Sequence, residues 1–204
     1  MNSQRDSKGR LTQSRATRLV ALALLAALSC ERDATQATTG GHGATLGTTM
    51  KAPKPTPAAS GLTADGRMQL GTEARCPVCA MPVTEHNKFA SAIELTDGRT
   101  YYFCGTGCML RTWLHPEVFL GARRPQLKRA VTRDYFTGKT VDARRAAWVA
   151  GSDVIGPMGP AIVPIFDEHE VAAFRSRHGG KHAFKFSELS DELWLKITGK
   201  QPGR

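Results

Sequence analysis

The chain has 204 residues, of which 28 are Lys or Arg and 18 are Asp or Glu, so its formal net charge is +10. Residues 1–29 carry +4 of this excess, and the remaining +6 is spread without a long basic run, so no nucleic-acid partner is expected. The chain is poor in cysteine, with five in all, and four of these fall in two close pairs.

Residues 1–29 are predicted to form an export signal. Two arginines, Arg15 and Arg18, precede an apolar run over residues 19–28, which is too short to span a bilayer but suits a signal peptide. The run ends at Cys30 in the sequence ALSC, which resembles a bacterial lipobox. We therefore expect Cys30 to be acylated, so that lipid anchors the protein in the bacterial cell envelope, facing the periplasm. Ordinary cleavage, with Cys30 left as a free thiol, is the alternative.

Residues 30–70 are expected to form a flexible tether. Thr, Ala, Gly and Pro predominate there and large apolar side chains are few, so the segment cannot bury enough surface to offset the entropy of ordering. Residues 71–198 remain for the folded part, which is long enough for one compact domain or two small subdomains.

The first half of the folded part is predicted to be a β-hairpin followed by a helix. The hairpin is indicated by an alternating strand pattern, a turn and an aromatic return strand, at residues 88–95, Asp97-Gly98 and residues 100–103. Cys104 then lies at the end of the return strand. Thr106 can cap a helix that Pro116 ends.

The second half is predicted to repeat this arrangement less regularly. Its expected elements are a strand over residues 128–135, a turn at Thr137-Gly138, a short element over 143–149, a strand over 161–166, a helix over 168–178, a strand over 181–186 and a helical tail over 192–197. Pro164 would confine its strand to a sheet edge or a bulge, and Gly179 is placed to end the helix. We therefore predict an α+β fold of two small β-hairpin-plus-helix units, residues 71–127 and 128–198.

Sulfur-bearing residues form the main chemical pattern of this domain. They are two pairs of thiols, each followed by a methionine: Cys76, Cys79 and Met81, then Cys104, Cys108 and Met109. Because the hairpin brings the start of the helix near the loop before the first strand, the four thiols can gather around one point. A place near a helix N-terminus would also favour the thiolate of Cys108.

Several chemistries fit this spacing. Two local disulfides are usual for an even number of cysteines in an oxidising compartment. Four thiolates without methionine would suit structural Zn²⁺, whereas Cu(I) accepts thiolates and thioethers and would use the methionines that zinc ignores. A dithiol oxidoreductase would prefer one CxxC motif within a thioredoxin-like pattern, which this sequence does not show. Spacing alone leaves zinc, copper and disulfides open.

Met158 adds a further sulfur at a distance. It lies in the turn sequence Gly156-Pro157-Met158-Gly159, which would hold its side chain on a loop. The alternative is that Met158 folds back and fills a gap in the core, which is a common use of methionine.

Three stretches together resemble the NosL family, the accessory lipoproteins of nitrous oxide reductase. They are CPVCAMPV from Cys76, DYFTGKTVDARRAAWVAGSDVIGPMG from Asp134, and EVAAFRSRHGGKHAFKFSEL from Glu170. The resemblance implies a membrane-anchored Cu(I) chaperone outside the cytoplasmic membrane. Such a protein takes copper from a copper-export pump or scavenges it, and passes it to the maturation machinery of the copper enzyme used in denitrification.

The resemblance also implies ligands and a fold. Its Cys/Met ligands match Cys79, Met81 and Met158, and its fold is akin to a domain of organomercurial lyase. Cys104 and Cys108 depart from the family pattern, because YYFCGTGCML resembles the second half of a TRASH- or YHS-type metal-binding module. This extra pair could complete a four-sulfur site, hold a second ion or form a disulfide.

Two consequences for function remain from the sequence. The extra cysteine pair keeps open an alternative function, a structural or sensory zinc-binding module of the envelope. The sequence shows no Ser/His/Asp set, no paired carboxylates and no phosphate-binding loop, so we do not expect an enzyme.

Overall fold

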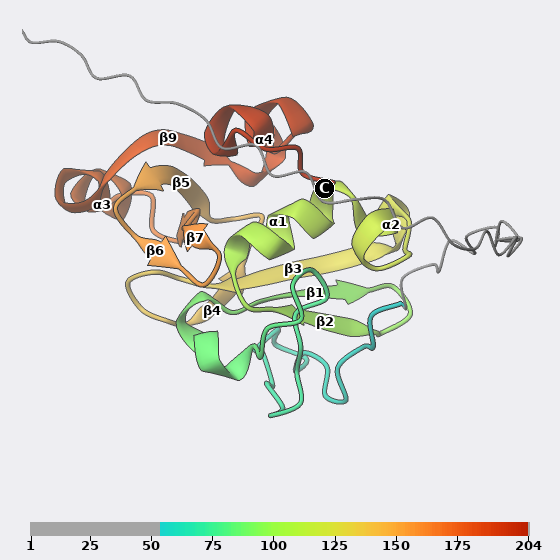
Figure 1. Ribbon diagram of the computed structural model, residues 1–204. Helices are drawn as coiled ribbons and strands as arrows, with labels where there is room; N and C mark the ends of the chain where they lie inside the picture. Colours follow the sequence, from blue (N-terminus) through green and yellow to red (C-terminus); the bar gives the residue numbers. More distant parts are fainter. Residues whose placement is uncertain (1–53, 204) are drawn as a thin grey trace, which may run out of the picture. The chain divides into compact units, whose positions relative to one another are not determined.

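The computed structural model describes residues 54–203. Within this range the chain forms two antiparallel sheets, a two-stranded hairpin and four α-helices (Figure 1). None of the helices in this range is long and apolar enough to cross a membrane. The predicted signal peptide and the predicted lipidation site at Cys30 lie outside the described residues.

The first sheet has the strand order β2-β1-β3-β4. Its strands are β1 (Ser91–Leu95), β2 (Thr100–Phe103), β3 (Leu127–Arg133) and β4 (Thr140–Asp142). β1 and β2 form the predicted hairpin, and its Gly98 has a φ of 87°, which favours glycine at this turn. β1 begins later than predicted because the residues before it form a 3-10 helix, η1 (Thr84–Phe89).

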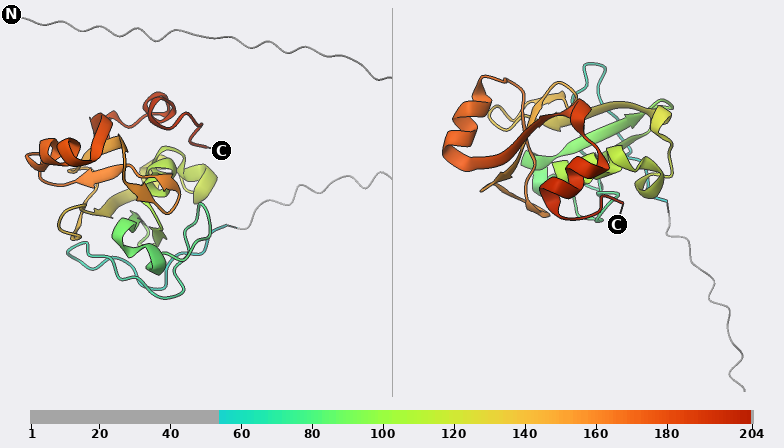
Figure 2. Two further views of the ribbon diagram at one scale, coloured as in Figure 1. Left: turned by 60° about the vertical axis from the view of Figure 1, so that its left-hand side comes forward. Right: turned by 90° about the horizontal axis from the view of Figure 1, so that it is seen from above.

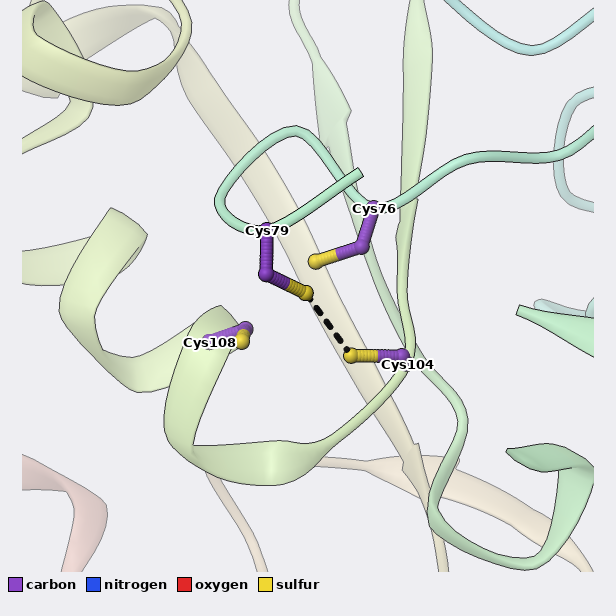
Figure 3. Close-up of side chains that lie close together, drawn as sticks. All are labelled: Cys76, Cys79, Cys104 and Cys108. Atoms are coloured by element: carbon purple, nitrogen blue, oxygen red, sulfur yellow. Dashed lines mark hydrogen bonds between the residues drawn. The ribbon is translucent and has the colours of Figure 1, made fainter. Parts of the chain in front are cut away.

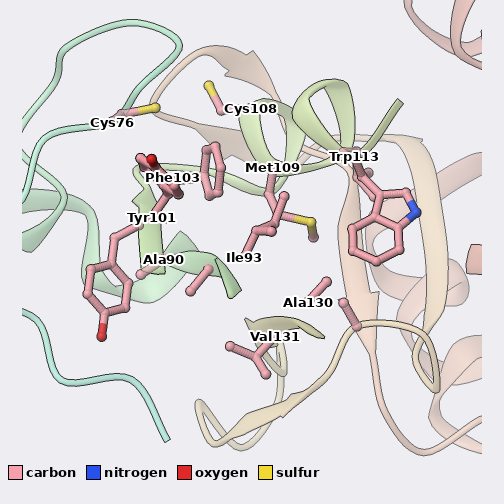
Figure 4. Packing of buried hydrophobic residues seen from close by; sticks show 14 of the residues in the cluster. Cys76, Ala90, Ile93, Tyr101, Phe103, Cys108, Met109, Trp113, Ala130 and Val131 are labelled. Atoms are coloured by element: carbon pink, nitrogen blue, oxygen red, sulfur yellow. The ribbon is translucent and has the colours of Figure 1, made fainter. Parts of the chain in front are cut away.

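Both faces of this sheet are covered, so every residue of β1 and β2 is buried. Helix α1 (Thr106–Leu114) packs on one face, and Figure 4 shows its Met109 on the side that faces Ile93. Residues 58–70 cover the other face, where the Tyr102 hydroxyl donates to the carbonyl of Gly61 and accepts from the N–H of Gln69, both at 3.0 Å.

Residues 58–70 therefore belong to the folded part, which corrects the predicted boundary of the flexible tether at residue 70. The N–H of Ala58 donates to the carbonyl of Thr100 at 2.8 Å, and the Met68 side chain is buried. The segment has few large side chains, as its composition indicates. Its backbone nevertheless finds hydrogen-bond partners on the sheet, and this pairing orders residues that composition alone predicted to be mobile.

The second sheet has the strand order β8-β5-β9. Its elements are β5 (Ala147–Ser152), β8 (Val163–Ile165) and β9 (Gly179–Lys185), with the helix α3 (Glu170–His178) packed on β5 and β9. Pro164 lies in the edge strand β8, and Gly179 ends α3 with a φ of 70°; both predictions are confirmed. Phe174 of α3 is fully buried in the small apolar cluster beneath the helix.

The remaining elements connect or cover these layers. They are α2 (Pro116–Phe119), η2 (Arg124–Gln126), the hairpin of β6 (Ile155–Gly156) and β7 (Gly159–Pro160), η3 (Phe186–Glu188) and α4 (Asp191–Thr198). Helices α2 and α3 lie at opposite ends of the folded part (Figures 1 and 2). Trp194 of α4 joins the main apolar cluster.

The α+β class is confirmed, but the predicted division at residue 127 is corrected. β3 and β4 follow that point in the chain and still pair into the first sheet, so the second sheet begins only at β5. β3 joins β1 through long-range antiparallel pairing. Local periodicity identifies a strand but does not say which strand it will pair with.

Candidate metal centre

The first cysteine pair lies in a tight loop that its own backbone closes. The N–H of Ala80 donates to the carbonyl of Cys76 at 2.8 Å, and the N–H of Cys76 donates to the carbonyl of Met81 at 3.0 Å. Ala80 has a φ of 61°, a left-handed conformation that glycine adopts more readily. The turn directs the side chains of Cys76 and Cys79 toward the same point (Figure 3).

The second pair is positioned by the end of a strand and the start of a helix. Cys104 follows β2 directly, and Cys108 lies in the first turn of α1. Gly105, rather than the predicted Thr106, is the N-cap residue of α1. The Thr106 hydroxyl instead donates to the carbonyl of Ile162 at 2.6 Å, so a tertiary contact fixes the start of this helix.

The four sulfur atoms form one cluster. All lie within 4.8 Å of one another, and the Sγ atoms of Cys79 and Cys104 are 3.3 Å apart (Figure 3). Tetrahedral coordination with metal–sulfur bonds of about 2.3 Å separates neighbouring sulfurs by roughly 3.8 Å, so small shifts would suffice to hold one ion. All four side chains are free thiols; those of Cys76, Cys104 and Cys108 are buried, and that of Cys79 is half-buried.

Hydrogen bonds among the thiols separate their pKa values. The Cys104 and Cys108 thiols donate to Cys76 and hold its pKa far below the usual thiol range. At Cys108, the hydrogen bonds with Cys104 and Cys76 and then burial raise the pKa. At Cys104, the bond with Cys108 lowers the pKa, but the bond with Cys76 and burial outweigh it, so the pKa is raised. Neighbouring thiols and burial thus raise the pKa of Cys108, against the thiolate expected there, and the lowest pKa in the cluster is that of Cys76.

Main-chain N–H groups of the loop also reach the sulfur atoms. The N–H of Val78 donates to Cys76, and the N–H of Met81 donates to Cys79, and each bond favours the thiolate. Burial is the larger effect at Cys79 and raises its pKa. The cluster thus holds one thiolate readily, and a cation is needed to ionise the other thiols.

Cys79 gives the cluster its access to solvent. It lines a groove of about 1080 Å³ together with its neighbours in the loop, with residues of α2 such as Val118, and with the first described residues near Lys54. Cys76 also borders this groove but is only 2% exposed, and Cys104 and Cys108 lie deeper. A ligand from outside therefore reaches the cluster most directly at Cys79.

The two methionines named from the sequence lie in different settings. Met158 is at the tip of the β6–β7 hairpin and is 56% exposed, so it does not fill a gap in the core. Met158 and Cys108 line one small cavity of about 40 Å³ at the N-terminus of α1. Met81 contributes main-chain hydrogen bonds to the loop, and its side chain is half-buried against the main apolar cluster.

One polar cluster beside this hairpin was not predicted from the sequence. The imidazole of His178 lies between the Asp153 carboxylate and the Tyr135 hydroxyl, at 2.9 and 3.2 Å. The three residues are far apart in the chain, so no local motif indicates that they meet.

A buried cluster of four thiols in a small α+β domain, with a thioether at the same helix end, offers donors of the kind that soft-metal-binding proteins use. The family model of NosL matches residues 67–194. The chain therefore belongs to the NosL family of copper-binding chaperones.

Two known proteins illustrate this relationship. The chain is 30% identical to the copper-binding lipoprotein NosL of Stutzerimonas stutzeri over 132 residues. This match covers 63% of this chain and 68% of that protein. The crystal structure of the copper chaperone NosL from Shewanella denitrificans has a similar fold, with a TM-score of 0.54 and 23% identity, over 61% of this chain and 96% of that one. The first is named for copper binding and the second as a copper chaperone, and neither name is that of an enzyme, in line with the expectation for this chain.

Proposed function

We propose that this protein is a membrane-anchored Cu(I) carrier outside the cytoplasmic membrane. In this proposal Cys30 carries the lipid anchor, and the protein faces the periplasm. It receives copper from a copper-export pump or scavenges it, and delivers it to the maturation machinery of nitrous oxide reductase. The observation that carries the proposal is the cluster of four thiols within 4.8 Å, with Cys79 accessible, in a chain of the NosL family.

The cluster combines retention with exchange. Cys76, Cys104 and Cys108 are buried, so thiolates at these positions are shielded from water and from competing ligands. Cys79 borders the groove, where a sulfur ligand of a partner can approach and replace it. Cu(I) accepts two or three sulfur ligands, so it can exchange ligands without leaving the protein.

Thioethers extend this site in the proposal. Met158 lies on an exposed hairpin next to Cys108, and Met81 lies in the loop of the first pair. A thioether needs no deprotonation and is a poor ligand for zinc, so it favours Cu(I) over Zn²⁺.

The geometry also favours a second candidate, a structural or sensory zinc-binding module. Four thiols within 4.8 Å can complete a closed tetrahedral site without a methionine. In that case the ion would stay bound, and Met81 and Met158 would not affect its affinity.

An anaerobic titration of the reduced full chain with Cu(I) and Zn²⁺, against chelators of known affinity, separates the two candidates. For a Cu(I) carrier we expect Cu(I) to displace bound Zn²⁺. Met158→Leu and Met81→Leu should each weaken Cu(I) binding about tenfold and leave Zn²⁺ binding unchanged. Ile155→Leu is the matched control, because Ile155 is an exposed apolar residue of the same hairpin and has no sulfur.

The result that overturns the carrier is one zinc ion per purified chain that excess Cu(I) does not displace. The anchor and the client are tested in cells. Cys30→Ser should release the protein from the membrane fraction, and loss of the protein should lower the copper content of nitrous oxide reductase. An unchanged copper content would reject that client.

A further inference from the structure

The β6–β7 hairpin is held against the N-terminus of α1. Beyond its C-terminal strand, the carbonyl of Ile162 accepts the buried Thr106 hydroxyl at 2.6 Å. At its tip, Pro157 lies so close to Gly105 that a Cβ on this glycine would come within 3.2 Å of the proline ring. These contacts place the loop that carries Met158 beside the helix turn that carries Cys108.

The N-terminal base of the hairpin is held by the chain Tyr135–His178–Asp153. The N–H of Asp153 donates to the carbonyl of His178 at 2.9 Å, and the Asp153 carboxylate lies 2.9 Å from Nδ1 of the same imidazole. Nε2 of His178 lies 3.2 Å from the Tyr135 hydroxyl. This chain of hydrogen-bonded side chains joins the residues after β3 to the end of α3 and to the segment that enters β6.

Packing fixes Tyr135, which lies at one end of this series of hydrogen bonds. The Tyr135 ring meets the fully buried Phe174 ring edge to face, with 4.9 Å between centroids. The ammonium group of Lys88 lies 5.1 Å from the Tyr135 ring centroid. The backbone N–H of Tyr135 also donates to the carbonyl of Pro164 at 3.0 Å, so Tyr135 is a fixed point from which the imidazole is oriented.

Both imidazole nitrogens of His178 are occupied by these contacts, so the arrangement uses the histidine as a connector rather than as a free ligand. We propose that Tyr135, His178 and Asp153 are positioning residues that fix the β6–β7 hairpin and so hold Met158 beside Cys108. This inference rests on the proposed function, in which Met158 is a ligand of Cu(I).

The physical reason is preorganisation. A thioether is a neutral ligand on a flexible side chain, and Met158 is more than half exposed. If the hairpin had to be ordered when copper binds, the loss of conformational entropy would reduce what the thioether contributes. A hairpin that is already fixed at both ends avoids most of this loss.

The test measures Cu(I) affinity of the reduced full chain by anaerobic competition. Tyr135→Phe and Asp153→Ala should each weaken binding by about three- to tenfold, as expected when one or two connecting hydrogen bonds are lost. Asp153→Asn keeps an acceptor for the imidazole and should stay within about twofold of the parent. Tyr101→Phe is the matched control, because it removes a hydroxyl whose partner is Arg99.

A double-mutant cycle distinguishes positioning from general destabilisation. In a Met158→Leu background, Tyr135→Phe should cause no further loss of Cu(I) affinity, because the ligand that it positions is already gone. Zn²⁺ affinity should not change in any of these variants. If Tyr135→Phe lowers Cu(I) affinity equally in both backgrounds, the positioning role is overturned, but the proposed function as a Cu(I) carrier is not.

A second readout needs no copper. NMR relaxation of the Met158 methyl group in the metal-free full chain should show greater mobility in Tyr135→Phe and Asp153→Ala than in the parent or in Tyr101→Phe. Unchanged mobility overturns the inference. If Met158→Leu alone leaves Cu(I) affinity unchanged, the ligand assignment in the proposed function fails, and the methyl measurement still decides whether the chain fixes the hairpin.

Discussion

The cysteine cluster and the β6–β7 hairpin bring sulfur to the same end of α1, but they are built in opposite ways. Cys76, Cys104 and Cys108 are at most 3% exposed, whereas Met158 is 56% exposed. The thiols are oriented by the backbone of a tight loop, a strand end and a helix turn. The thioether is oriented by a short hairpin that side chains from other elements hold in place.

The difference follows from the chemistry of the two kinds of sulfur. A thiol must lose a proton to bind a metal ion, so its neighbours and its N–H donors decide how strongly it binds. A thioether carries no proton and gains little from such an environment, so what matters is where it is held. In the proposed function the cluster therefore retains the ion, and the hairpin adjusts its selectivity and exchange.

Removing a thiol of the cluster should have the largest effect. Cys108→Ser should weaken Cu(I) binding by at least about 100-fold, because a charged thiolate ligand contributes more than a neutral thioether and more than the outer partners whose loss costs 10–100-fold. Cys30→Ser is the matched control and should keep full affinity in the same competition titration. If Cys108→Ser lowers Cu(I) affinity no more than Met158→Leu does, the cluster is not the main binding site and the comparison of the two regions is wrong.

Metal binding at the cluster should depend on pH, and the hairpin should not alter this dependence. The raised pKa values of Cys79, Cys104 and Cys108 keep these thiols protonated near neutral pH, so binding releases protons. Affinity should therefore fall as pH falls, by about tenfold per pH unit for each proton released, whereas Cys76, already a thiolate, adds nothing to the slope.

The measurement is a series of competition titrations between about pH 6 and pH 8, in the parent and in Met158→Leu. Met158→Leu should lower affinity by the same factor at every pH, because a thioether does not titrate. An affinity that does not change with pH would contradict the description of the cluster as mostly protonated.

Relieving the strained loop of the first cysteine pair should have the smallest effect. Ala80→Gly removes a left-handed alanine that costs about 1–2 kcal/mol, and it adds back about 0.5–1 kcal/mol of unfolded-state entropy. We expect the metal-free protein to be stabilised by up to about 1 kcal/mol in denaturant unfolding.

Gly98→Ala, in the turn between β1 and β2, is the control for Ala80→Gly, and its expected effect on stability has the opposite sign. Gly98 also has a positive φ, and a Cβ there would meet no atom within 4 Å, so the substitution isolates backbone strain and should destabilise by about 1 kcal/mol. If Ala80→Gly destabilises the protein as well, the backbone does not impose the geometry of the first cysteine pair.

Several features of the fold and site could be predicted from local sequence. Asp97-Gly98 gave the hairpin turn because few residues suit its backbone angles, and Pro164 gave the edge strand because proline lacks a donor. The spacing of the two cysteine pairs around this hairpin indicated that four thiols could meet but did not decide whether they would; the structure brings them together. These are short-range constraints that each residue carries with it.

Other features were misjudged because they depend on distant partners. Residues 58–70 have few large apolar side chains, but Tyr102 and the edge of β2 supply hydrogen-bond partners for their backbone. β3 joined the first sheet rather than a second unit because its pairing partner is β1. Neighbouring thiols and burial raise the pKa of Cys108, and these partners cannot be seen from its position near a helix N-terminus.

The sequence by itself determined that the folded part carries two close pairs of thiols with methionines nearby, and its motifs indicated the NosL family, because residue types and their spacing are local properties. Only the tertiary structure decided how that sulfur is arranged. Burial and the order in which strands pair left three thiols buried and one half-buried, and tertiary packing brought Tyr135, His178 and Asp153 together beside the hairpin that carries Met158. Contacts of this kind join residues far apart in the chain, and no local pattern specifies them.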